Sequence, residues 1–375
     1  MADDRSVASP RATLEIPASR RVALVVGPGG VGKTTVAAAL AMRAAAAGRR
    51  TIVVTIDPSR RLAQALGLLA QDGHVAGDIA RVEHDGVRLD ALLLDTQRTF
   101  DTIVREHSPS KAAADAMLVN PIYRAMVRSL GGALEYAASA QVQMLASSGA
   151  YDLVVLDTPP TANAIDFLEA PAQIAEVANN PAAKFLAQSG RIGMRFLGLG
   201  SGLVMKVLES VGGGAFVGDL GRFLGDFGAV LTEFQHRAGE LADLLVSPGT
   251  GVILTTAATD FSVREALAFL AVLAERKLRI DGVVFNRVDA EVPPWPGDDA
   301  VTAALTAAGV TDVVGERERL RALRDDIAHH ERLAIDGERA LRTRWPRTPV
   351  VVVPRVVPPP SSLADLRRLG DALWV

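Results

Sequence analysis

The most constraining feature of the sequence is a glycine-rich loop that stands between an apolar run and an alanine-rich stretch. The loop, GPGGVGKT from Gly27 to Thr34, fits the P-loop pattern of glycine, four residues, glycine, lysine and serine or threonine. The run before it, 22–26, is short and rich in valine, which is typical of a buried strand. The stretch after it, 36–47, is rich in alanine and stops at Gly48, which is typical of a helix. Because strand, loop and helix follow in the order that the pattern requires, the sequence predicts a phosphate-binding loop.

The composition of this loop has a chemical reason. Glycines let the backbone curl so that amide N–H groups point inward at phosphates, and the following helix adds the positive end of its dipole. We expect Lys33 to neutralise the β- and γ-phosphates, Thr34 to ligate Mg²⁺ and Thr35 to reach the α-phosphate. ATP and Mg²⁺ are therefore the expected substrate and cofactor. The residues assigned to phosphate binding are Gly27, Pro28, Gly29, Gly30, Val31, Gly32, Lys33, Thr34 and Thr35.

Further apolar runs predict a parallel sheet. The run 51–56 completes a β-α-β unit with the first strand, and such a unit implies parallel strands. Four more runs of this kind follow at 153–156, 252–256, 283–285 and 350–353. Special or polar residues come directly after four of the runs, where open α/β sheets place their ligands: Asp57, Asp157, Asn286 and Pro354. The expected fold class is α/β, a P-loop NTPase with a mostly parallel sheet flanked by helices and an inserted helical subdomain.

The inserted subdomain is expected from two long stretches that lack a strand pattern, about 96–148 and 165–247. In the second stretch, apolar residues recur in steps of three or four and mark one stripe along a helix: Phe216, Leu220, Phe223, Phe227, Val230 and Phe234. We expect one P-loop ATPase domain at 21–375, which contains this subdomain and follows a flexible tail at 1–20. The segment 316–344 is dense in charge, so we expect a solvated helix there, with His329 and His330 on its surface.

Composition excludes several classes of function. The chain has no cysteine, which rules out disulfides, thiolate metal sites and cysteine nucleophiles. Its formal net charge of −3 indicates no bulk affinity for nucleic acid or anionic lipid. The first twenty residues contain no apolar run and do not fit a signal peptide, so we expect a cytoplasmic protein. The most apolar stretch, 192–208, contains Arg195 and Lys206 and is shorter than the roughly 20 residues that span a bilayer, so stable membrane insertion is not expected.

Two aspartates at strand ends are candidates for the chemistry of hydrolysis. Asp157 fits the pattern of a magnesium-side aspartate, which acts through a bound water. Asp57 is placed to hold an attacking water near the γ-phosphate. The alternative for both is a turn residue at the end of a strand, a common place for Asp.

Four segments together resemble the ArsA-type ATPases, which include the arsenical-pump ATPase and the targeting ATPase for tail-anchored membrane proteins. The segments are GPGGVGKTT from Gly27, TIDPSRRLAQALGL from Thr55, YDLVVLDTPPTANAIDFL from Tyr151 and VVFNRV from Val283. They follow one another in the family's order and cover about 21–286. The resemblance implies a parallel-sheet nucleotide domain with a helical subdomain, which works as a face-to-face dimer that closes around ATP.

The resemblance also implies roles for individual residues. Asp57 matches the catalytic aspartate of the first switch, which orients water, and Asn286 matches the asparagine that contacts adenine. Pro354 and Arg355 match the loop that covers the base. Glu265 aligns with a glutamate that approaches the nucleotide across the dimer.

The chain departs from the family at two places in its nucleotide motifs. Pro28 stands where the family has a lysine that reaches the partner's phosphates, and a proline side chain carries neither donor nor charge. A homodimer should therefore hydrolyse ATP slowly, unless Arg60 or Arg61 replaces the lysine. A paralogous ATPase with its own lysine would complete the site in a heterodimer. In the second switch, 157–160, the motif continues with Ala-Asn-Ala at 162–164, where Gly-His-Thr is common. The lack of cysteine excludes both a zinc clamp of the dimer and a thiol site for arsenite.

Two hypotheses remain for the cellular task. In the first, ATP binding rearranges the apolar helical insertion, which exposes or hides a groove for a hydrophobic protein client. In the second, the chain is a regulatory or positioning ATPase of the septum-site or partition type, or a weakly active subunit of a heterodimer. The cue for a membrane-bound positioning ATPase would be the apolar C-terminal stripe of Leu363, Leu366, Leu369, Leu373 and Trp374, although such a stripe more often packs against its own domain.

Overall fold

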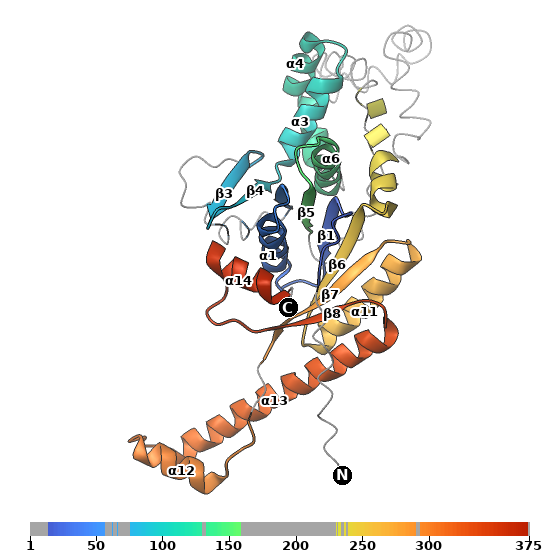
Figure 1. Cartoon of the computed structure of the whole chain (residues 1–375). Coiled ribbons are helices and arrows are strands. Elements are labelled where there is room, and N and C mark those ends of the chain that lie inside the picture. Colours follow the sequence, from blue (N-terminus) through green and yellow to red (C-terminus); the bar gives the residue numbers. More distant parts are fainter. Residues whose placement is uncertain are drawn as a thin grey trace, which may run out of the picture.

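A twisted eight-stranded sheet forms the centre of the protein (Figure 1). The computed structural model describes residues 14–56, 62, 66, 76–129, 133–158, 230, 232–233, 236–237, 239–289 and 293–373. The strand order is β3-β4-β2-β5-β1-β6-β7-β8, and every neighbouring pair is parallel except β3 with β4. The strands are β1 (Val22–Val26), β2 (Thr51–Thr55), β3 (Ile79–His84), β4 (Val87–Leu93), β5 (Leu153–Asp157), β6 (Thr250–Ala257), β7 (Ile280–Val288) and β8 (Val350–Pro354).

Helices cover both faces of this sheet. One face carries α1 (Lys33–Ala46) and α14 (Leu363–Leu373), and the other carries α6 (Ala133–Ser147), α11 (Asp260–Glu275) and the inner part of α13 (Val313–Arg344). Side chains of β1 alternate between the two layers: Ala23 and Val25 enter the first, while Val22, Leu24 and Val26 enter the second. The sheet is therefore buried on both sides, which explains why its strands appear in the sequence as continuous apolar runs.

The expected fold class is confirmed, a P-loop-type α/β fold with a mostly parallel sheet. The six predicted strand runs are all strands, although β6 and β7 extend further in both directions than the runs indicate. The helix after the glycine loop begins at Lys33 and includes nearly all of the alanine-rich stretch that predicted it. The antiparallel hairpin of β3 and β4 was not predicted from the sequence.

The C-terminal stripe packs against α1. Leu366, Leu369 and Leu373 are buried in the same core layer as the alanines of α1. The two helices approach so closely that a Cβ added at Gly370 would lie 2.6 Å from the carbonyl oxygen of Ala39. The stripe is thus occupied within the domain, as the more common alternative predicted, while Trp374 lies outside the described residues.

The first helical stretch forms a separate layer at one end of the molecule (Figure 1). It consists of α3 (Thr96–His107), α4 (Lys111–Val119), α5 (Pro121–Ser129) and the first half of α6. Its core is built from large side chains, among them Phe100 and Tyr136, whose ring centroids are 5.5 Å apart. The second helical stretch is described only at 230, 232–233, 236–237 and 239–247, and these residues are helical except for 247. The predicted phenylalanine stripe lies outside the described residues except for Val230, which joins this core.

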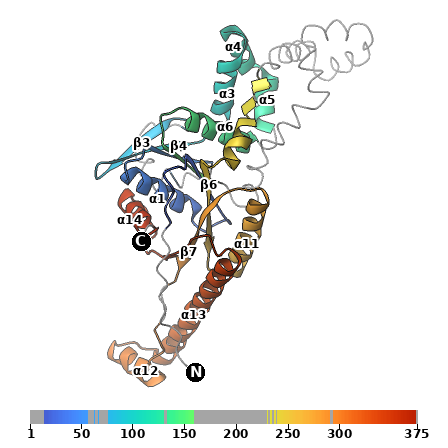
Figure 2. The same ribbon diagram turned by 45° about the vertical axis from the view of Figure 1, so that its right-hand side comes forward.

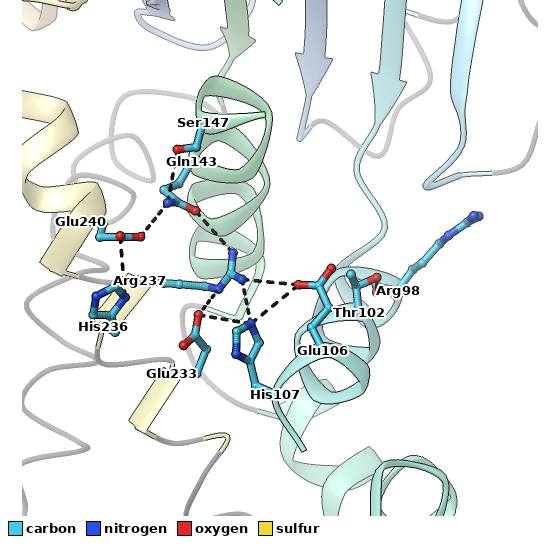
Figure 3. A network of polar contacts seen from close by, with 10 residues as sticks. All are labelled: Arg98, Thr102, Glu106, His107, Gln143, Ser147, Glu233, His236, Arg237 and Glu240. Carbon is cyan, nitrogen blue, oxygen red and sulfur yellow. Dashed lines mark hydrogen bonds and ion pairs between the residues drawn. The ribbon is translucent and has the colours of Figure 1, made fainter. Parts of the chain in front are cut away.

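A polar network joins these returning helical residues to α3 and α6 (Figure 3). Arg237 is its centre: its Nε donates to Glu233 at 2.7 Å, and its Nη2 lies 3.0 Å from Nε2 of His107. Gln143 of α6 donates to Glu240 at 2.6 Å and accepts from Arg237 at 3.4 Å. Because the Arg237 side chain is only 11% exposed, the network holds the three helices together from within their interface.

An arm of two helices projects from the opposite end of the molecule (Figures 1 and 2). It consists of α12 (Asp298–Ala307) and the outer part of α13, and the chain enters it from β7 and leaves it for β8. The expectation of a solvated helix fits this outer part. It does not hold for the inner part, where Ala334, Gly337 and Leu341 are buried. Among the described helices, none is long and apolar enough to cross a bilayer, and 192–208 lies outside the described residues.

Candidate nucleotide-binding site

The glycine loop curls at the carboxyl end of β1, in the centre of the sheet. Gly27, Gly30 and Gly32 have φ angles of 150°, 79° and 93°, which residues with a Cβ rarely adopt. Gly27 also has no space for a side chain, because an added Cβ would lie 2.0 Å from the carbonyl oxygen of Thr255. The close approach of β1 and β6 therefore requires glycine at the first position of the loop.

The helix that follows presents its amino end to the loop. Lys33 is the first residue of α1, is 8% exposed, and donates from Nζ to the carbonyl oxygen of Pro28 at 2.9 Å. No side chain caps the first turn of α1, and no acidic residue lies within it. Thr34 and Thr35 are half-buried in the same turn. An uncapped amino end beside an ammonium group has the composition of an anion-binding site.

Asp157 lies beside this loop because β5 is the neighbour of β1. It pairs in register with Val25 of β1 and with Thr55 of β2. Its carboxylate is completely buried and accepts a hydrogen bond from Oγ1 of Thr55 at 2.9 Å. Thr158 donates to the carbonyl oxygen of Val25 at 2.9 Å, which fixes the end of the strand against the P-loop strand. A carboxylate held at this position fits the expected role beside a magnesium ion.

A cavity of about 290 Å³ opens next to the first turn of α1. It brings together four of the predicted nucleotide residues from three separate elements: Thr35, Asn286, Pro354 and Arg355. The rest of its lining is Arg287, Val353, Val356, Val357, Pro359, Pro360 and Leu369. Its apolar, proline-rich wall and its position beside the phosphate loop suit a nucleobase.

Two neighbouring side chains at the end of β7 hold the glycine loop by its backbone. Asn286, 6% exposed, donates from Nδ2 to the carbonyl oxygen of Val31 at 2.8 Å. Arg287 donates from Nη1 to the carbonyl oxygen of Gly30, also at 2.8 Å. Gly32 gives Asn286 the space it needs, since an added Cβ would lie 2.5 Å from Nδ2. Consecutive carbonyl groups of the loop are thus fixed by consecutive side chains of one strand.

Arg287 is a site residue that the sequence analysis missed. Its backbone has a φ angle of 58°, and the pairing of β7 with β8 shifts register between Phe285 and Val288. This irregularity turns Arg287 toward the loop while Asn286 stays in the strand. The only sequence signal was its place directly after Asn286.

The remaining predicted residues are distributed as follows. Pro28 is buried, with its carbonyl oxygen bonded to Lys33. Arg355 donates from Nη2 to Asp289 at 3.3 Å, and its backbone amide donates to Val288 at 2.8 Å. Glu265 is half-buried on α11 and does not line the cavity, so its expected contact across a dimer stays a prediction. Asp57 lies outside the described residues, as do 159–164 of the second switch.

Comparison with known proteins decides the family. The family model described as anion-transporting ATPase matches residues 20–293, which include the glycine loop, Asp157 and Asn286. The chain belongs to the anion-transporting ATPase family. This match confirms the resemblance to ArsA-type ATPases stated above.

Individual relatives of this anion-transporting ATPase match over part of their length. Protein Rv2184c of Mycobacterium tuberculosis is 34% identical over 169 residues, which is 42% of this chain and 38% of the relative. The ATPase get3 of Neurospora crassa is 27% identical over 180 residues, or 48% of this chain and 51% of the relative. Uncharacterized protein SCO2128 of Streptomyces coelicolor is 32% identical over 155 residues, or 41% and 38%. The matches thus span between about two fifths and one half of these curated relatives.

Proposed function

We propose that this chain is a cytoplasmic, magnesium-dependent ATPase that works as a dimer and couples its nucleotide state to the helical subdomain, which binds or delivers a hydrophobic protein client. One observation carries the enzymatic part of the proposal. The glycine loop, Lys33 and Asp157 lie at adjoining strand ends, next to a cavity near the lower size limit of ligand pockets, about 300 Å³.

The described residues divide the work of binding a triphosphate. The loop amides and the amino end of α1 bind the phosphate oxygens, and Lys33 neutralises charge on the β- and γ-phosphates. Thr34 and Asp157 would hold Mg²⁺, with Asp157 acting through a water molecule. The bound ion would supply charge neutralisation as bond cleavage proceeds.

The orientation of Asn286 favours adenine over guanine. Its amide nitrogen is committed to the carbonyl oxygen of Val31, so its Oδ1 is the atom that accepts a hydrogen bond from a base in the cavity. The amino group of adenine donates at the corresponding edge, whereas guanine presents a carbonyl oxygen there. In competition binding, the affinity for ATP should exceed the affinity for GTP by about tenfold or more. This factor corresponds to one hydrogen bond gained with adenine and one buried acceptor left unsatisfied with guanine.

Turnover is assigned to Asp57, which orients the attacking water and receives its proton. Asp57→Asn preserves shape and removes the basic carboxylate. We expect this variant to bind ATP with the affinity of the parent and to lose steady-state hydrolysis. Equal rates for parent and variant would reduce Asp57 to a turn residue.

Pro28 sets the expected rate of a homodimer. A charge-stabilising side chain supplied across a dimer is worth on the order of 10³-fold in rate, and Pro28 cannot supply one. Pro28→Lys should therefore raise hydrolysis, and so should mixing the parent with a paralogous ATPase that carries the lysine. Because Pro28 is buried, its lysine replacement must extend outward along the loop, so circular dichroism and ATP affinity are needed as controls. A fast homodimer that neither change improves would point to Arg60 or Arg61 as the cation.

The coupling to a client is supported by the continuity of α6. The first half of this helix belongs to the core of the helical layer, and its second half packs on the sheet. Gln143 of α6 accepts a hydrogen bond from Arg237 and donates one to Glu240, so the helix that returns from the insertion is attached to α6. A movement at either end of α6 is therefore transmitted to both the helical layer and the sheet.

The client itself is tested with a defined probe. A peptide with the sequence of a transmembrane helix should bind the chain more tightly with a slowly hydrolysed ATP analogue than with ADP, or the reverse. A scrambled polar peptide is the control. Equal affinity in both nucleotide states would leave an ATPase without this client function. The C-terminal stripe no longer supports the alternative of a membrane-bound positioning ATPase, because Leu366, Leu369 and Leu373 are buried against α1.

A further inference from the structure

Helix α13 carries an apolar residue at every seventh position from its first residue to its last turns. The set is Val313, Leu320, Ile327, Ala334 and Leu341. A strict seven-residue repeat corresponds to 3.5 residues per turn, so these side chains form one stripe along the helix. Leu323 lies three residues after Leu320, on the same side. Such a stripe is typical of a helix that packs lengthwise against another.

The inner half of this stripe is covered by the domain. Ala334 is 5% exposed and Leu341 is completely buried. Between them, Gly337 touches α11 and β7 so closely that an added Cβ would lie 2.8 Å from Cγ2 of Val263 and 3.1 Å from the ring of Phe285. Here the stripe is an ordinary part of the protein core.

The outer half of the same stripe is open. Leu320 is 41% exposed and Leu323 is 56% exposed. The polar contacts that join α12 and the loop before it to α13 come from another side of the helix. Arg317 donates to Thr302, Arg321 pairs with Asp298, and Arg324 donates to the carbonyl oxygen of Pro293. These three arginines lie about 40–100° around the helix from Leu320, away from Leu323.

We propose that the open stripe, Leu320 and Leu323, pairs with the same stripe of a second copy of this chain, with the two helices antiparallel about a two-fold axis. Arg319 and Asp326 flank the stripe on the side away from α12, and their side chains are 71% and 65% exposed. On their own helix Arg319 pairs with Glu316 and Asp326 lies 3.9 Å from His330, so the pairing with a partner would compete with these contacts. When Leu320 packs against Leu323 of the partner subunit, Arg319 comes opposite Asp326 of the partner subunit. Symmetry repeats each of these contacts, so one face of the helix is complementary to itself.

The charges select the antiparallel arrangement. In a parallel pair of helices, a residue beside the seam meets the residue five positions later on the partner. Arg319 would then face Arg324, and Asp326 would face Glu331, so both flanking pairs would repel. In the antiparallel pair, the flanking side away from α12 joins Arg319 with Asp326 twice. On the other side, Arg317 comes opposite Arg324 of the partner subunit, a pair of like charges, but each of these side chains is turned to α12 or its preceding loop.

This contact is separate from the nucleotide-dependent dimer proposed above. It uses the arm that projects beyond β7 and β8, whereas the phosphate loop lies at the end of β1 (Figure 1). The seam is short, and exposed ion pairs contribute only about 0.2–1 kcal/mol each, so the pairing is expected to be reversible and to weaken with salt.

Sedimentation velocity on the full chain without nucleotide tests the contact. The parent should show a monomer–dimer equilibrium that depends on concentration, and Leu323→Glu should weaken it by at least about tenfold. Val314→Glu is a matched control: Val314 is 58% exposed on the same helix, but nine residues from Leu323 and therefore on the opposite side. A parent that is monomeric at every concentration, or equal weakening by both variants, would overturn the proposal.

Charge exchange tests the geometry itself. Arg319→Asp alone places two aspartates opposite each other, and Asp326→Arg alone places two arginines opposite each other, so each should weaken the dimer severalfold. The double variant restores opposite charges and should recover the parent's association. Far-UV circular dichroism confirms that every variant folds. If the double variant is no better than the single variants, the antiparallel pairing is wrong.

Discussion

The parallel strands are stabilised differently at their amino ends and at their carboxyl ends, which are called here the amino edge and the carboxyl edge of the sheet. At the amino edge, charged side chains pair with each other across strands: Arg20 with Asp281 at 2.6 Å and Arg50 with Asp152 at 2.6 Å. At the carboxyl edge, two side chains of β7 bind the backbone of the glycine loop: Asn286 binds the carbonyl oxygen of Val31, and Arg287 binds that of Gly30. The first arrangement joins strand starts to each other. The second arrangement shapes a loop through its carbonyl groups. Stability and nucleotide binding should therefore be separable by mutation.

The largest effect is expected at the carboxyl edge, from Lys33→Ala. Loss of the ammonium group leaves the loop amides alone with the triphosphate charge. We expect the dissociation constant for ATP to rise by about 100-fold, or ~3 kcal/mol, in calorimetry. The midpoint of urea unfolding should change little. Unchanged affinity would remove the assignment of the phosphate site.

The next largest effect is expected at the amino edge, from Asp281→Asn. The side chains of Arg20 and Asp281 are only 13% and 7% exposed, and loss of the carboxylate charge leaves the guanidinium without its counter-ion. Urea unfolding should show a loss of ~2 kcal/mol in the free energy of unfolding, with ATP affinity unchanged. Asp371→Asn is the control, because its partner Arg43 is 3.6 Å away and the aspartate is 52% exposed. Equal losses in both variants would contradict a special role for the amino edge.

A smaller effect on nucleotide affinity is expected from Arg287→Ala. One hydrogen bond to the carbonyl oxygen of Gly30 is lost, so the loop is less well fixed. The dissociation constant for ATP should rise by about fivefold, or ~1 kcal/mol, and KM should change more than kcat. Arg287→Lys should recover part of the loss, and Arg368→Ala, at a side chain 82% exposed, should have no effect. A change confined to kcat would give Arg287 a different role.

The smallest effect depends on pH and concerns Asp152. Two donors of Arg50, its side chain and its backbone amide, lower the pKa of Asp152 to about 2 from its ordinary value of 3.8. A lowered pKa contributes stability that is complete above pH 3.8 and is lost as pH falls toward 2. The parent should therefore be slightly more stable than Asp152→Asn at neutral pH, and this difference should shrink in acid. A difference that is constant with pH would exclude this ionic contribution.

The parallel strands could be predicted because they are buried on both faces, which makes each one a continuous apolar run. The loop of Gly27 to Thr34 could be predicted because its chemistry is local in sequence. The same holds for Asp157 and Asn286, whose positions at strand ends place them at one edge of a parallel sheet. The apolar pattern of the insertion predicts helices, but 159–229 lies outside the described residues, so most of this prediction is untested.

The hairpin of β3 and β4 had a signal that the sequence analysis did not use. Asp85 and Gly86 form its two-residue turn, with φ angles of 49° and 76°, and Asp-Gly is a preferred pair for such turns. The run 79–84 is polar and exposed on one side, so it lacks the apolar continuity of the other strands. Arg287 had no usable signal, because its partner Gly30 is 257 residues away in the chain.

The position of β1 has a consequence for synthesis of the chain. Among the described strands β1 is the first to be made, yet it lies between β5 and β6, and Val22 pairs with Val154 on one side and Thr250 on the other. A ribosome that adds about 5–20 residues per second reaches Thr250 on the order of 10 s or more after Val22. Until Val154 is made, β1 has two unpaired edges, and until Thr250 is made, the glycine loop has no β6 to support it. A nascent chain of this protein should therefore remain unable to bind ATP until most of it has left the ribosome.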